Sequence, residues 1–400
     1  MNILIKFYTI TTLFLLICSY VADAQKVVQI PMGQNIGKSK ELAISNIAEN
    51  IRFIPLETNE NCLFGNDISK IVLVDDTIFV SDYNYIFKYD LNGNFITRIG
   101  KKGRGPGEYA KGFQTFLVDK DKQQLIGFDL LDQKMMEYDF DANFLREVQV
   151  DFFPGPVEWN GNGDIVVYNM SFTYEKEPWH DLYLLDKNAK TIQKNRFKKQ
   201  TDKRYGLMVY PALFYHYKGK TRYKNPYENV IHELDEKGRT TPVYELDYGK
   251  YEKYSDVDDV EVQVKNGIGT NRSNPKSFEK ISLLGLSETD AYLFICYGHQ
   301  ERRKLGVFDK SNGTFFNLFD TNFDLYGFHD DLYGGLPLFP RVGLKNSQFF
   351  TYYTALEFKE LLKAAKSLKP ELKNMLNKID ENDNPVLILV ELKQSQPDEK

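Results

Sequence analysis

The chain has 400 residues, a formal net charge of −5 and 14% aromatic residues, including 26 Tyr and 29 Phe. This length accommodates one large all-β domain or two ordinary ones. The abundance of flat rings favours strands, because rings pack well on a pleated surface. A weakly acidic charge without a basic stripe excludes the electrostatic footprint of a nucleic-acid-binding protein, so no nucleic-acid partner is expected.

The first 24 residues have the pattern of an export signal. Lys6 precedes a mostly apolar run at 7–18, and an A-x-A cleavage site ends at Ala24. We expect cleavage after Ala24 and hence a protein of the periplasm or the cell surface. A lipoprotein anchored through Cys18 is the alternative, although Ile17 stands where a lipid-attachment site prefers a small residue. No later run approaches the ~20 apolar residues of a membrane-spanning helix, so no transmembrane segment is expected.

One short phrase recurs along the chain: an apolar strand that ends in Asp, a polar turn with Asn or Gly, and a second strand. Its first copy runs from Phe87 to Phe95. The aspartates of the five copies are 49, 47, 49 and 74 residues apart, and a period of about 45–50 built from strands and tight turns is typical of propeller blades. The repeat therefore predicts a β-propeller with these strand-ending residues: Asp90, Asp139, Asp186, Asp235 and Asp309.

Turn-forming residues divide the middle of the chain into blades of four strands. The first five blades are expected at 71–99, 113–150, 157–196, 211–246 and 281–319. The sixth has only three strands, at 339–344, 349–353 and 385–391. The orphan strand 51–56 is therefore predicted to complete blade 6, because a propeller without this closure keeps an unpaired edge.

Two insertions interrupt the period. A long polar segment at 249–277 accounts for the 74-residue spacing. Residues 355–379 have helical periodicity, follow a capping box of Thr354 and Glu357, and contain Pro370 at an expected first helical position. We expect two helices packed on the rim, with a partner-docking helix as the alternative. The expected division is a signal peptide at 1–24, an extension at 25–46, the propeller at 47–393 and a disordered tail at 394–400.

Three segments carry a resemblance to a known family. They are Arg98–Tyr109 with its Gly-Pro-Gly-Glu phrase, Ile51–Glu57, and Asn382–Val390. In these segments the chain resembles the six-bladed, NHL-like propellers that are common among exported proteins of Bacteroidetes-type bacteria. The resemblance implies an all-β, six-bladed β-propeller of four-stranded blades, closed by an N-terminal strand and with a helical insertion in the last blade. It implies no activity, because that family is largely uncharacterised.

The glycine-rich loop at 103–108 is the sharpest candidate for a ligand site. Its glycines permit close approach of backbone to a ligand, and the guanidinium of Arg104 offers a planar donor fork. Glu108 can frame a polar group, and Tyr109 offers a ring for stacking. Since loops on a rigid scaffold often carry function, Arg104, Glu108 and Tyr109 are predicted to contact a ligand on one face of the disc. A purely structural turn between blades is the alternative.

Other chemistry-bearing patterns are less specific. An aromatic cluster at 205–227, with Trp179 and His180 before it, is the second candidate for a binding surface. No metalloprotease pair, nucleophile elbow, dinucleotide fingerprint or helix–loop–helix calcium spacing is present. Four polar residues at expected strand ends could face a central channel and hold calcium or another divalent metal, although they are equally good turn residues: Asp75, Asp119, Asn160 and Asp164.

The main functional hypothesis is a monomeric, exported, non-enzymatic propeller that binds a protein, peptide or glycan on one face of the disc. It rests on a well-defined scaffold without a recognisable catalytic set, and function has to be argued from a site rather than from a fold. No metal-binding residue is assigned and no cofactor is expected. The alternative is a channel-centred, metal-dependent hydrolase or lyase of the six-bladed propeller class.

Overall fold

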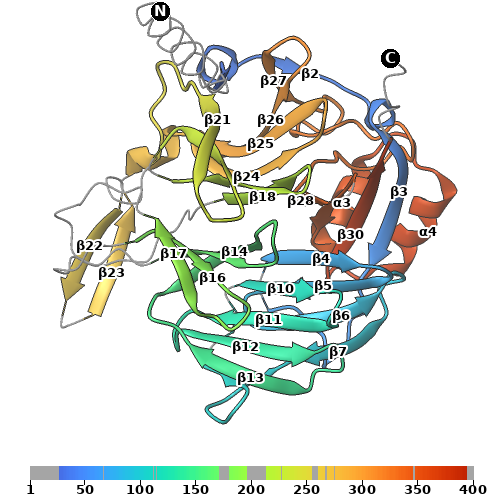
Figure 1. Ribbon diagram of the computed structural model, residues 1–400. Coiled ribbons are helices and arrows are strands. Elements are labelled where there is room, and N and C mark those ends of the chain that lie inside the picture. Colours follow the sequence, from blue (N-terminus) through green and yellow to red (C-terminus); the bar gives the residue numbers. More distant parts are fainter. Residues whose placement is uncertain are drawn as a thin grey trace, which may run out of the picture.

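The computed structural model describes residues 27–393, with gaps at 66, 111, 114, 171–179, 196–212, 227, 255–259, 266–267, 274 and 346. Six antiparallel blades of four strands surround a central axis (Figure 1). The predicted six-bladed propeller is therefore confirmed. The expected signal peptide and C-terminal tail lie outside the described residues.

Blades 1 to 3 are consecutive meanders, in which each strand pairs with the next. Blade 1 contains β4 (Lys70–Val74), β5 (Thr77–Ser81), β6 (Ile86–Asp90) and β7 (Phe95–Ile99). The short strands β8 (Lys101–Lys102) and β9 (Glu108–Tyr109) follow it. Blade 2 contains β10 (Thr115–Asp119), β11 (Gln124–Asp129), β12 (Lys134–Asp139) and β13 (Phe144–Gln149). Blade 3 contains β14 (Pro154–Trp159), β15 (Ile165–Asn169), β16 (Leu182–Leu185) and β17 (Thr191–Asn195).

Blades 4 to 6 carry the insertions. Blade 4 contains β18 (Leu213–Tyr217), β19 (Lys220–Lys224), β20 (Val230–Leu234) and β21 (Thr240–Leu246). The hairpin of β22 (Val260–Lys265) and β23 (Ile268–Ser273) and the 3-10 helix η3 (Pro275–Glu279) follow. Blade 5 contains β24 (Ser282–Glu288), β25 (Tyr292–His299), β26 (Arg302–Asp309) and β27 (Thr314–Leu318). Blade 6 contains β28 (Val342–Lys345), β29 (Gln348–Tyr353), β30 (Val386–Leu392) and the early strand β3 (Ala48–Pro55).

The early strand closes the ring as predicted. β3 pairs antiparallel with β30, with Ile51 opposite Val390 and Phe53 opposite Ile388. The N-terminal extension also adds two strands that were not predicted: β1 (Val28–Ile30) extends blade 4 and β2 (Ser39–Lys40) extends blade 5, both in parallel. These segments are short and largely exposed, so they lack the alternation that reveals a strand in sequence. The 3-10 helices η1 (Gly33–Asn35) and η2 (Ile44–Asn46) flank β2.

The recurring aspartates anchor the turns between the third and fourth strands. Asp90 Oδ1 accepts hydrogen bonds from the amides of Asn92 at 2.8 Å and Asn94 at 2.9 Å. The same i+2 and i+4 amides bind Asp139, Asp186 and Asp235, and Asp309 binds the amide of Ser311. Each carboxylate thus replaces missing backbone partners in a tight turn, which explains why the phrase recurs in each of blades 1 to 5.

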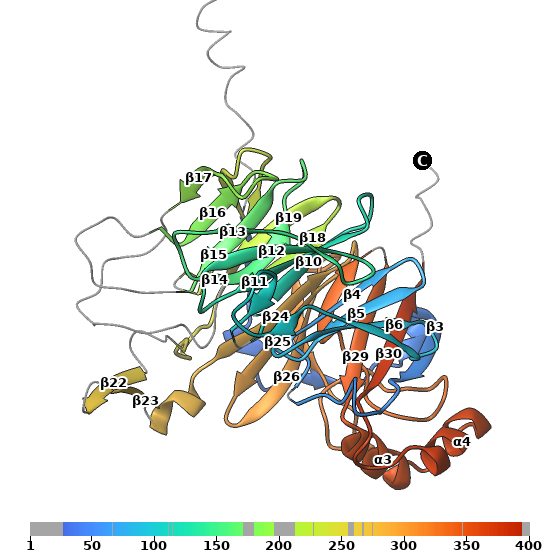
Figure 2. The ribbon, with the colours of Figure 1, turned by 90° about the horizontal axis from the view of Figure 1, so that it is seen from below.

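Two insertions project from the same side of the disc (Figure 2). One is the β22–β23 hairpin, between blades 4 and 5; the other is the helical pair α3 (Ala355–Ala364) and α4 (Pro370–Lys378), between β29 and β30. The predicted capping box of Thr354 and Glu357 and the predicted position of Pro370 are confirmed. We call this side the insertion face. It carries the loops between second and third strands and the connections between blades. No helix among the described residues has the length and apolarity needed to cross a membrane.

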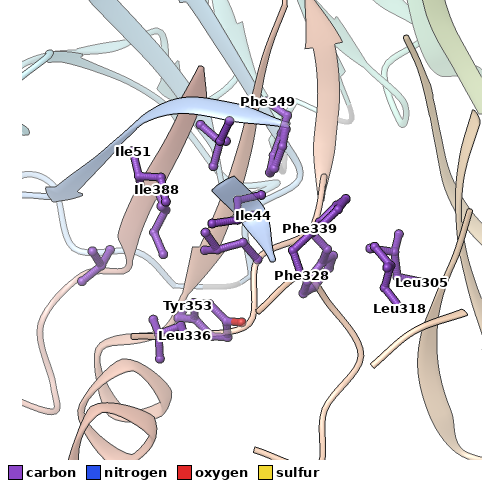
Figure 3. Close-up of a cluster of buried hydrophobic side chains, with 14 of the residues drawn as sticks. Ile44, Ile51, Leu305, Leu318, Phe328, Leu336, Phe339, Phe349, Tyr353 and Ile388 are labelled. Atoms are coloured by element: carbon purple, nitrogen blue, oxygen red, sulfur yellow. The ribbon is translucent and has the colours of Figure 1, made fainter. Parts of the chain in front are cut away.

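Apolar side chains fill the seams between blades. One cluster joins Ile44 and Ile51 of the N-terminal region, Leu305 of blade 5, and Phe349 and Ile388 of blade 6 (Figure 3). Burial of each such side chain contributes roughly 1.5–3 kcal/mol, so the N-terminal segment is part of the core rather than an appendage. Both cysteines of the described chain, Cys62 and Cys296, are buried free thiols.

Candidate functional site

The predicted ligand loop at 103–108 lies against the outer strands of blade 2. The hydroxyl of Tyr138, in β12, donates to the carbonyl of Gly107 at 2.8 Å. A Cβ atom at Gly107 would lie 2.4 Å from the ring of Phe144, the first residue of β13. β12 and β13 are the two strands of blade 2 farthest from the axis, so the tip of this loop lies near the rim and away from the channel mouth.

The three predicted contact residues have different environments. Glu108 closes its own loop: it accepts from the amide of Gly105 at 2.8 Å and pairs with Lys101 at 3.0 Å, and these contacts lower the pKa of Glu108. Tyr109 is fully buried, with its ring centroid 4.4 Å from that of Phe113, so the expectation of an open stacking ring is corrected. Arg104 is exposed. Ligand contact by Arg104 and Glu108 stays a prediction.

The strand-end residues considered for a channel metal lie in separate turns. Asp75 pairs with Lys120 and Asp119 with Lys122, each at 2.6 Å. Asp164 accepts from the amide side chain of Asn162 at 2.7 Å, and the buried Asn160 donates to the carbonyl of Asp235 at 3.1 Å. These contacts are those of turn residues, which was the other interpretation of the pattern.

One group of potential metal ligands occurs among the described residues, at the outer edge of blade 5. Ligand atoms of Glu41, Asp320 and His329 lie within 4.8 Å of one another. Asp320 is fully buried, and its Oδ2 lies 3.1 Å from Nδ1 of His329. Glu41 follows β2, which pairs with the outermost strand of blade 5, so this group is remote from the channel in which a metal was considered.

The predicted aromatic cluster belongs mainly to the interior of blade 4. Tyr215 and Tyr223 are buried, and the rings of Phe214 and Tyr223 lie 5.3 Å apart. The ring of Tyr217 faces Lys310 at 4.1 Å, and its hydroxyl donates to Asp290 at 2.9 Å. Most of these rings therefore pack rather than present a stacking surface. Four members of the predicted cluster lie outside the described residues: Trp179, Tyr205, Tyr210 and Tyr227.

The innermost strands bring together an ionic group that the sequence did not reveal. Nε2 of His216, in β18, lies 3.0 Å from Oε1 of Glu158, in β14. Lys70, in β4, reaches the same carboxylate at 4.0 Å and donates to the carbonyl of Val157 at 3.3 Å. Burial opposes ionisation of Glu158, but the charges of Lys70 and His216 outweigh it and lower the pKa of Glu158 to about 2. Blades 1, 3 and 4 are thus joined by an ionised carboxylate.

A second ionic network lies in the seam between blades 4 and 5. The fully buried carboxylate of Glu288 accepts from Arg222, from Lys310 at 2.5 Å, and from the hydroxyls of Tyr215 at 3.0 Å and Tyr244 at 2.7 Å. Burial lowers the pKa of Lys310, although the charge of Glu288 opposes this shift. Each charged side chain of this network is in an ion pair. The network therefore has the features of a structural element that joins blades 4 and 5.

The insertion face presents an exposed tyrosine on a rigid turn of blade 1. Tyr83 is 47% exposed and has a φ of 69°, a backbone conformation that is strained for a bulky residue. The buried carboxylate of Asp82 holds the turn: it accepts from the amides of Asn84 at 2.9 Å and Tyr85 at 2.8 Å, and from Gly65 at 2.9 Å. The bond to Gly65 also fixes the connection from blade 6, in which Leu63 is 56% exposed.

The equivalent turn of blade 2 is built in the same way. Asp129 is buried and accepts from the amides of Leu131 at 2.9 Å, Asp132 at 3.2 Å and Ala110 at 2.9 Å. Leu131 is 46% exposed. Ala110 and Gly112 bring the two turns together, because Ala110 donates to Asp129 and a Cβ atom at Gly112 would lie 2.0 Å from the carbonyl oxygen of Tyr83. We call Leu63, Tyr83 and Leu131 the apolar turn surface.

Sequence reasoning missed this surface for a specific reason. Asp82 and Asp129 stand at the ends of second strands, whereas the aspartates of the recurring phrase stand at the ends of third strands. A usable signal was present, since an Asp at the end of the second strand is followed in both blades by a large apolar residue within two positions. The ionic groups gave no such signal, because their members come from different blades.

Several solved structures are similar to this one. One is a Bacteroides fragilis protein that is named as an exported protein by inference. It is 19% identical, with a TM-score of 0.70 over 92% of this chain and 100% of that one. A Bacteroides vulgatus protein of the DUF4221 family is 12% identical, with a TM-score of 0.49 over 86% and 97%. Virginiamycin B lyase of Staphylococcus aureus is 11% identical, with a TM-score of 0.42 over 85% and 99%. The likeness to the Bacteroides fragilis protein, at this identity, shows the fold alone.

Comparison at the level of sequence gives the family. No curated protein matches the chain. A family described as a domain of unknown function, DUF4934, matches residues 27–391, which is nearly all of the described chain. The protein therefore belongs to the DUF4934 family.

Proposed function

We propose that this protein is an exported binding protein that holds a peptide or protein partner on the insertion face, with the apolar turn surface as its anchor. The observation that carries the proposal is the exposure of Leu63, Tyr83 and Leu131 on turns that the buried carboxylates of Asp82 and Asp129 hold rigid. Apolar side chains that are exposed together on one face, rather than scattered singly, mark interaction sites.

Rigidity is what separates these turns from ordinary exposed loops. Binding costs roughly 0.5–1.5 kcal/mol for each side chain that has to be ordered. The backbone that carries Tyr83 and Leu131 is already fixed, because each of the two buried carboxylates accepts three amide hydrogen bonds. This preorganisation lowers the free energy that binding has to spend on ordering the turns. The strained φ of Tyr83 is consistent with this, since strained residues cluster at ligand-binding positions.

The side-chain types favour a peptide or protein over a glycan. Sugar rings stack on flat aromatic faces, whereas two of the three anchors here are leucines. Apolar anchors ringed by polar groups are typical of protein interfaces. The β22–β23 hairpin and the α3–α4 pair project from the same face (Figure 2) and would enlarge the contact area for a partner. In repeat architectures, insertions often gather on the binding face.

Export is supported by two independent observations. The first 24 residues have the pattern of a signal peptide. The Bacteroides fragilis relative, whose own name assumes export, shares the fold over its whole length. A partner at the cell surface or in the periplasm therefore fits the proposal.

A selected peptide provides a direct test of the binding surface. Peptides from a display library would be enriched on the wild-type protein, and their affinities measured for Tyr83→Ala and Leu131→Ala. We expect each substitution to weaken binding about tenfold, which is the effect of a moderate hot spot. Ile192→Ala is the matched control, because Ile192 is 54% exposed on β17, the outermost strand of blade 3. Folded double variants that bind as tightly as the wild type would exclude this surface.

A channel enzyme is the second candidate, and it rests on the pair of Glu158 and His216. A histidine 3.0 Å from an ionised carboxylate has the arrangement of a general base and its orienting group. A lyase or hydrolase activity that is lost in His216→Ala and Glu158→Gln, but kept in Tyr83→Ala, would favour this function over partner binding.

A further inference from the structure

Arg341 is held firmly at the entry to blade 6, but its hydrogen bonds are incomplete. Its guanidinium carbon lies 4.4 Å from the centre of the Tyr352 ring, and Nη1 donates to the carbonyl of Tyr352 at 3.0 Å. Nε is buried and has no acceptor among the described residues. Nε of Arg222 also lacks an acceptor, but Arg222 meets two carboxylates, whereas Arg341 meets none among the described residues. Because an arginine is always charged, Arg341 is the one of the two that has an unmatched charge for a partner to meet.

Thr351 adds a second polar group without a partner. It follows Phe350 on β29, which pairs with Val342 and whose carbonyl accepts from the amide of Arg341. Thr351 is fully buried, and its hydroxyl has no hydrogen-bond partner in the part of the chain that the structure describes. A buried hydroxyl left unpaired costs about 1–3 kcal/mol.

Arg303 brings a second guanidinium to the same end of the seam. It lies two residues before Leu305 on β26, so both side chains are on one side of the strand. Leu305 packs in the core that blades 5 and 6 share, which places Arg303 on the side that faces blade 6. Arginine ion pairs among the described residues involve Arg146, Arg222 and Arg239 instead.

The two arginines act on the same neighbours. Burial raises the pKa of the Cys296 thiol, and the charges of Arg303 and Arg341 both oppose that rise. Burial likewise raises the pKa of Tyr352, and the same two charges oppose it, while Asp67 faces the hydroxyl of Tyr352 and reinforces the rise. Arg303 and Arg341 therefore make a common positive field between blades 5 and 6.

Glycines leave space beside Arg303. Gly298 is its direct partner in the β25–β26 ladder, and Gly285 is the partner of Cys296 on β24. A Cβ atom at Gly298 would meet nothing closer than 3.9 Å, and one at Gly285 would meet only Cys296, at 3.6 Å. The strand surface next to this guanidinium is thus bare backbone, which permits close approach of a ligand.

From this juxtaposition we propose that the insertion face carries a site for an oxyanion, namely a carboxylate, sulfate or phosphate group, between Arg303 and Arg341. The planar donor forks of arginine match such groups in a bidentate manner, and the hydroxyl of Thr351 is a further donor. Nε of Arg341 gains its missing acceptor in the bound state. The site rests on its own contacts and does not depend on the apolar turn surface.

Calorimetric titration with sodium sulfate, phosphate and acetate, each against sodium chloride at equal ionic strength, tests the site. We expect saturable binding of at least one anion by the wild type, at least tenfold weaker in Arg303→Gln and in Thr351→Val. Because sulfate also stabilises proteins without binding to a site, the readout is the binding isotherm rather than a melting temperature.

Arg302→Gln is the matched control. Arg302 is also exposed and adjacent in sequence, but it lies on the other side of β26. Its affinity is expected to stay within twofold of the wild type. The absence of saturable binding of all three anions, or an equal loss in Arg302→Gln and Arg303→Gln, would overturn the proposal. Binding that depends on Arg303 for only one anion would identify the preferred group.

Discussion

Two groups of arginines flank blade 5, and they differ in whether carboxylates of the chain pair with their guanidinium groups. In the seam with blade 4, Arg222 meets Glu233 at 3.2 Å and Glu288, and Glu288 also meets Lys310 and two tyrosine hydroxyls. In the seam with blade 6, neither Arg341 nor Arg303 is in an ion pair among the described residues. Nε is buried without an acceptor in both Arg222 and Arg341, so the two seams differ in their ion pairs. A guanidinium paired with carboxylates of its own chain indicates a structural role, whereas one without a carboxylate is open to a ligand.

The largest effect is expected from breaking the ion-pair network between blades 4 and 5. Glu288→Gln leaves Arg222 and Lys310 buried without their shared carboxylate, and loss of one member of a buried ion pair typically costs about 3–5 kcal/mol. Urea unfolding should show this loss in the free energy of unfolding. Asp290→Asn is the control, because Asp290 is exposed and should change stability by less than about 1 kcal/mol. Similar losses in the free energy of unfolding for the two variants would show that the network does not stabilise the fold.

The channel carboxylate should give the protein a distinct pH dependence. The pKa of Glu158 is about 2 in the folded state, compared with about 4.3 in an unfolded chain. The lowered value contributes stability that is fully present above about pH 4.3 and is lost as the pH falls toward 2, with an upper limit of about 3 kcal/mol. Glu158→Gln should remove this part of the acid dependence, measured as the difference in unfolding free energy between pH 6 and pH 3. An unchanged difference would contradict the pairing with Lys70 and His216.

A smaller loss is expected from the turn that carries Tyr83. Asp82→Ala removes the acceptor of three amide hydrogen bonds in a buried setting and should cost about 2 kcal/mol. Hydrogen exchange at the amides of Asn84 and Tyr85 should accelerate. Tyr83→Ala removes only the exposed ring and should leave both stability and exchange nearly unchanged. Equal destabilisation by the two substitutions would mean that Tyr83 supports the fold rather than a ligand.

The smallest effect is expected at the recurring turns of the opposite face. Slight burial of Asp90 opposes its ionisation, but hydrogen bonds from Asn94 and Asn92 outweigh it and lower the pKa of Asp90. A lowered pKa stabilises the fold above the unfolded value of about 4 and is lost as the pH falls through the folded value. Asp90→Asn should therefore matter slightly at pH 7 and not at all at the lowest pH, as a thermal melt at each pH would show. A larger loss at low pH would contradict this sign.

Much of the fold could be predicted from the sequence because propeller blades are local structures. Each blade is a meander of neighbouring strands, and Asp90 and its counterparts mark the turns with a pattern of residues four apart. Ring closure was predictable from the number of strands. Blade 6 had only three predicted strands, and 51–56 was the predicted strand that belonged to no other blade. The short parallel strands β1 and β2 were missed, because their pairing depends on the outer edges of blades 4 and 5 rather than on their own sequence.

The sites were less predictable, because their members are distant in sequence. Arg222 and Glu288 are 66 residues apart, and Lys70 and Glu158 come from blades 1 and 3. The glycine-rich loop drew attention as a possible ligand cradle, but the structure places its tip against Tyr138 and Phe144 and buries Tyr109. Glycines permit close approach of any neighbouring group, whether a ligand or another part of the chain. In this loop the neighbouring group is blade 2.

Hydrogen exchange with a bound peptide is the most direct test of the view that the insertion face is the functional side of the disc. A peptide selected on the wild-type protein should slow exchange in 63–65, 82–85 and 129–132, where buried carboxylates fix the exposed anchors. The turns that follow Asp90 and Asp139 lie at the opposite end of the blades and should exchange as in the free protein. Protection of those turns, with no change at 82–85 and 129–132, would contradict the account.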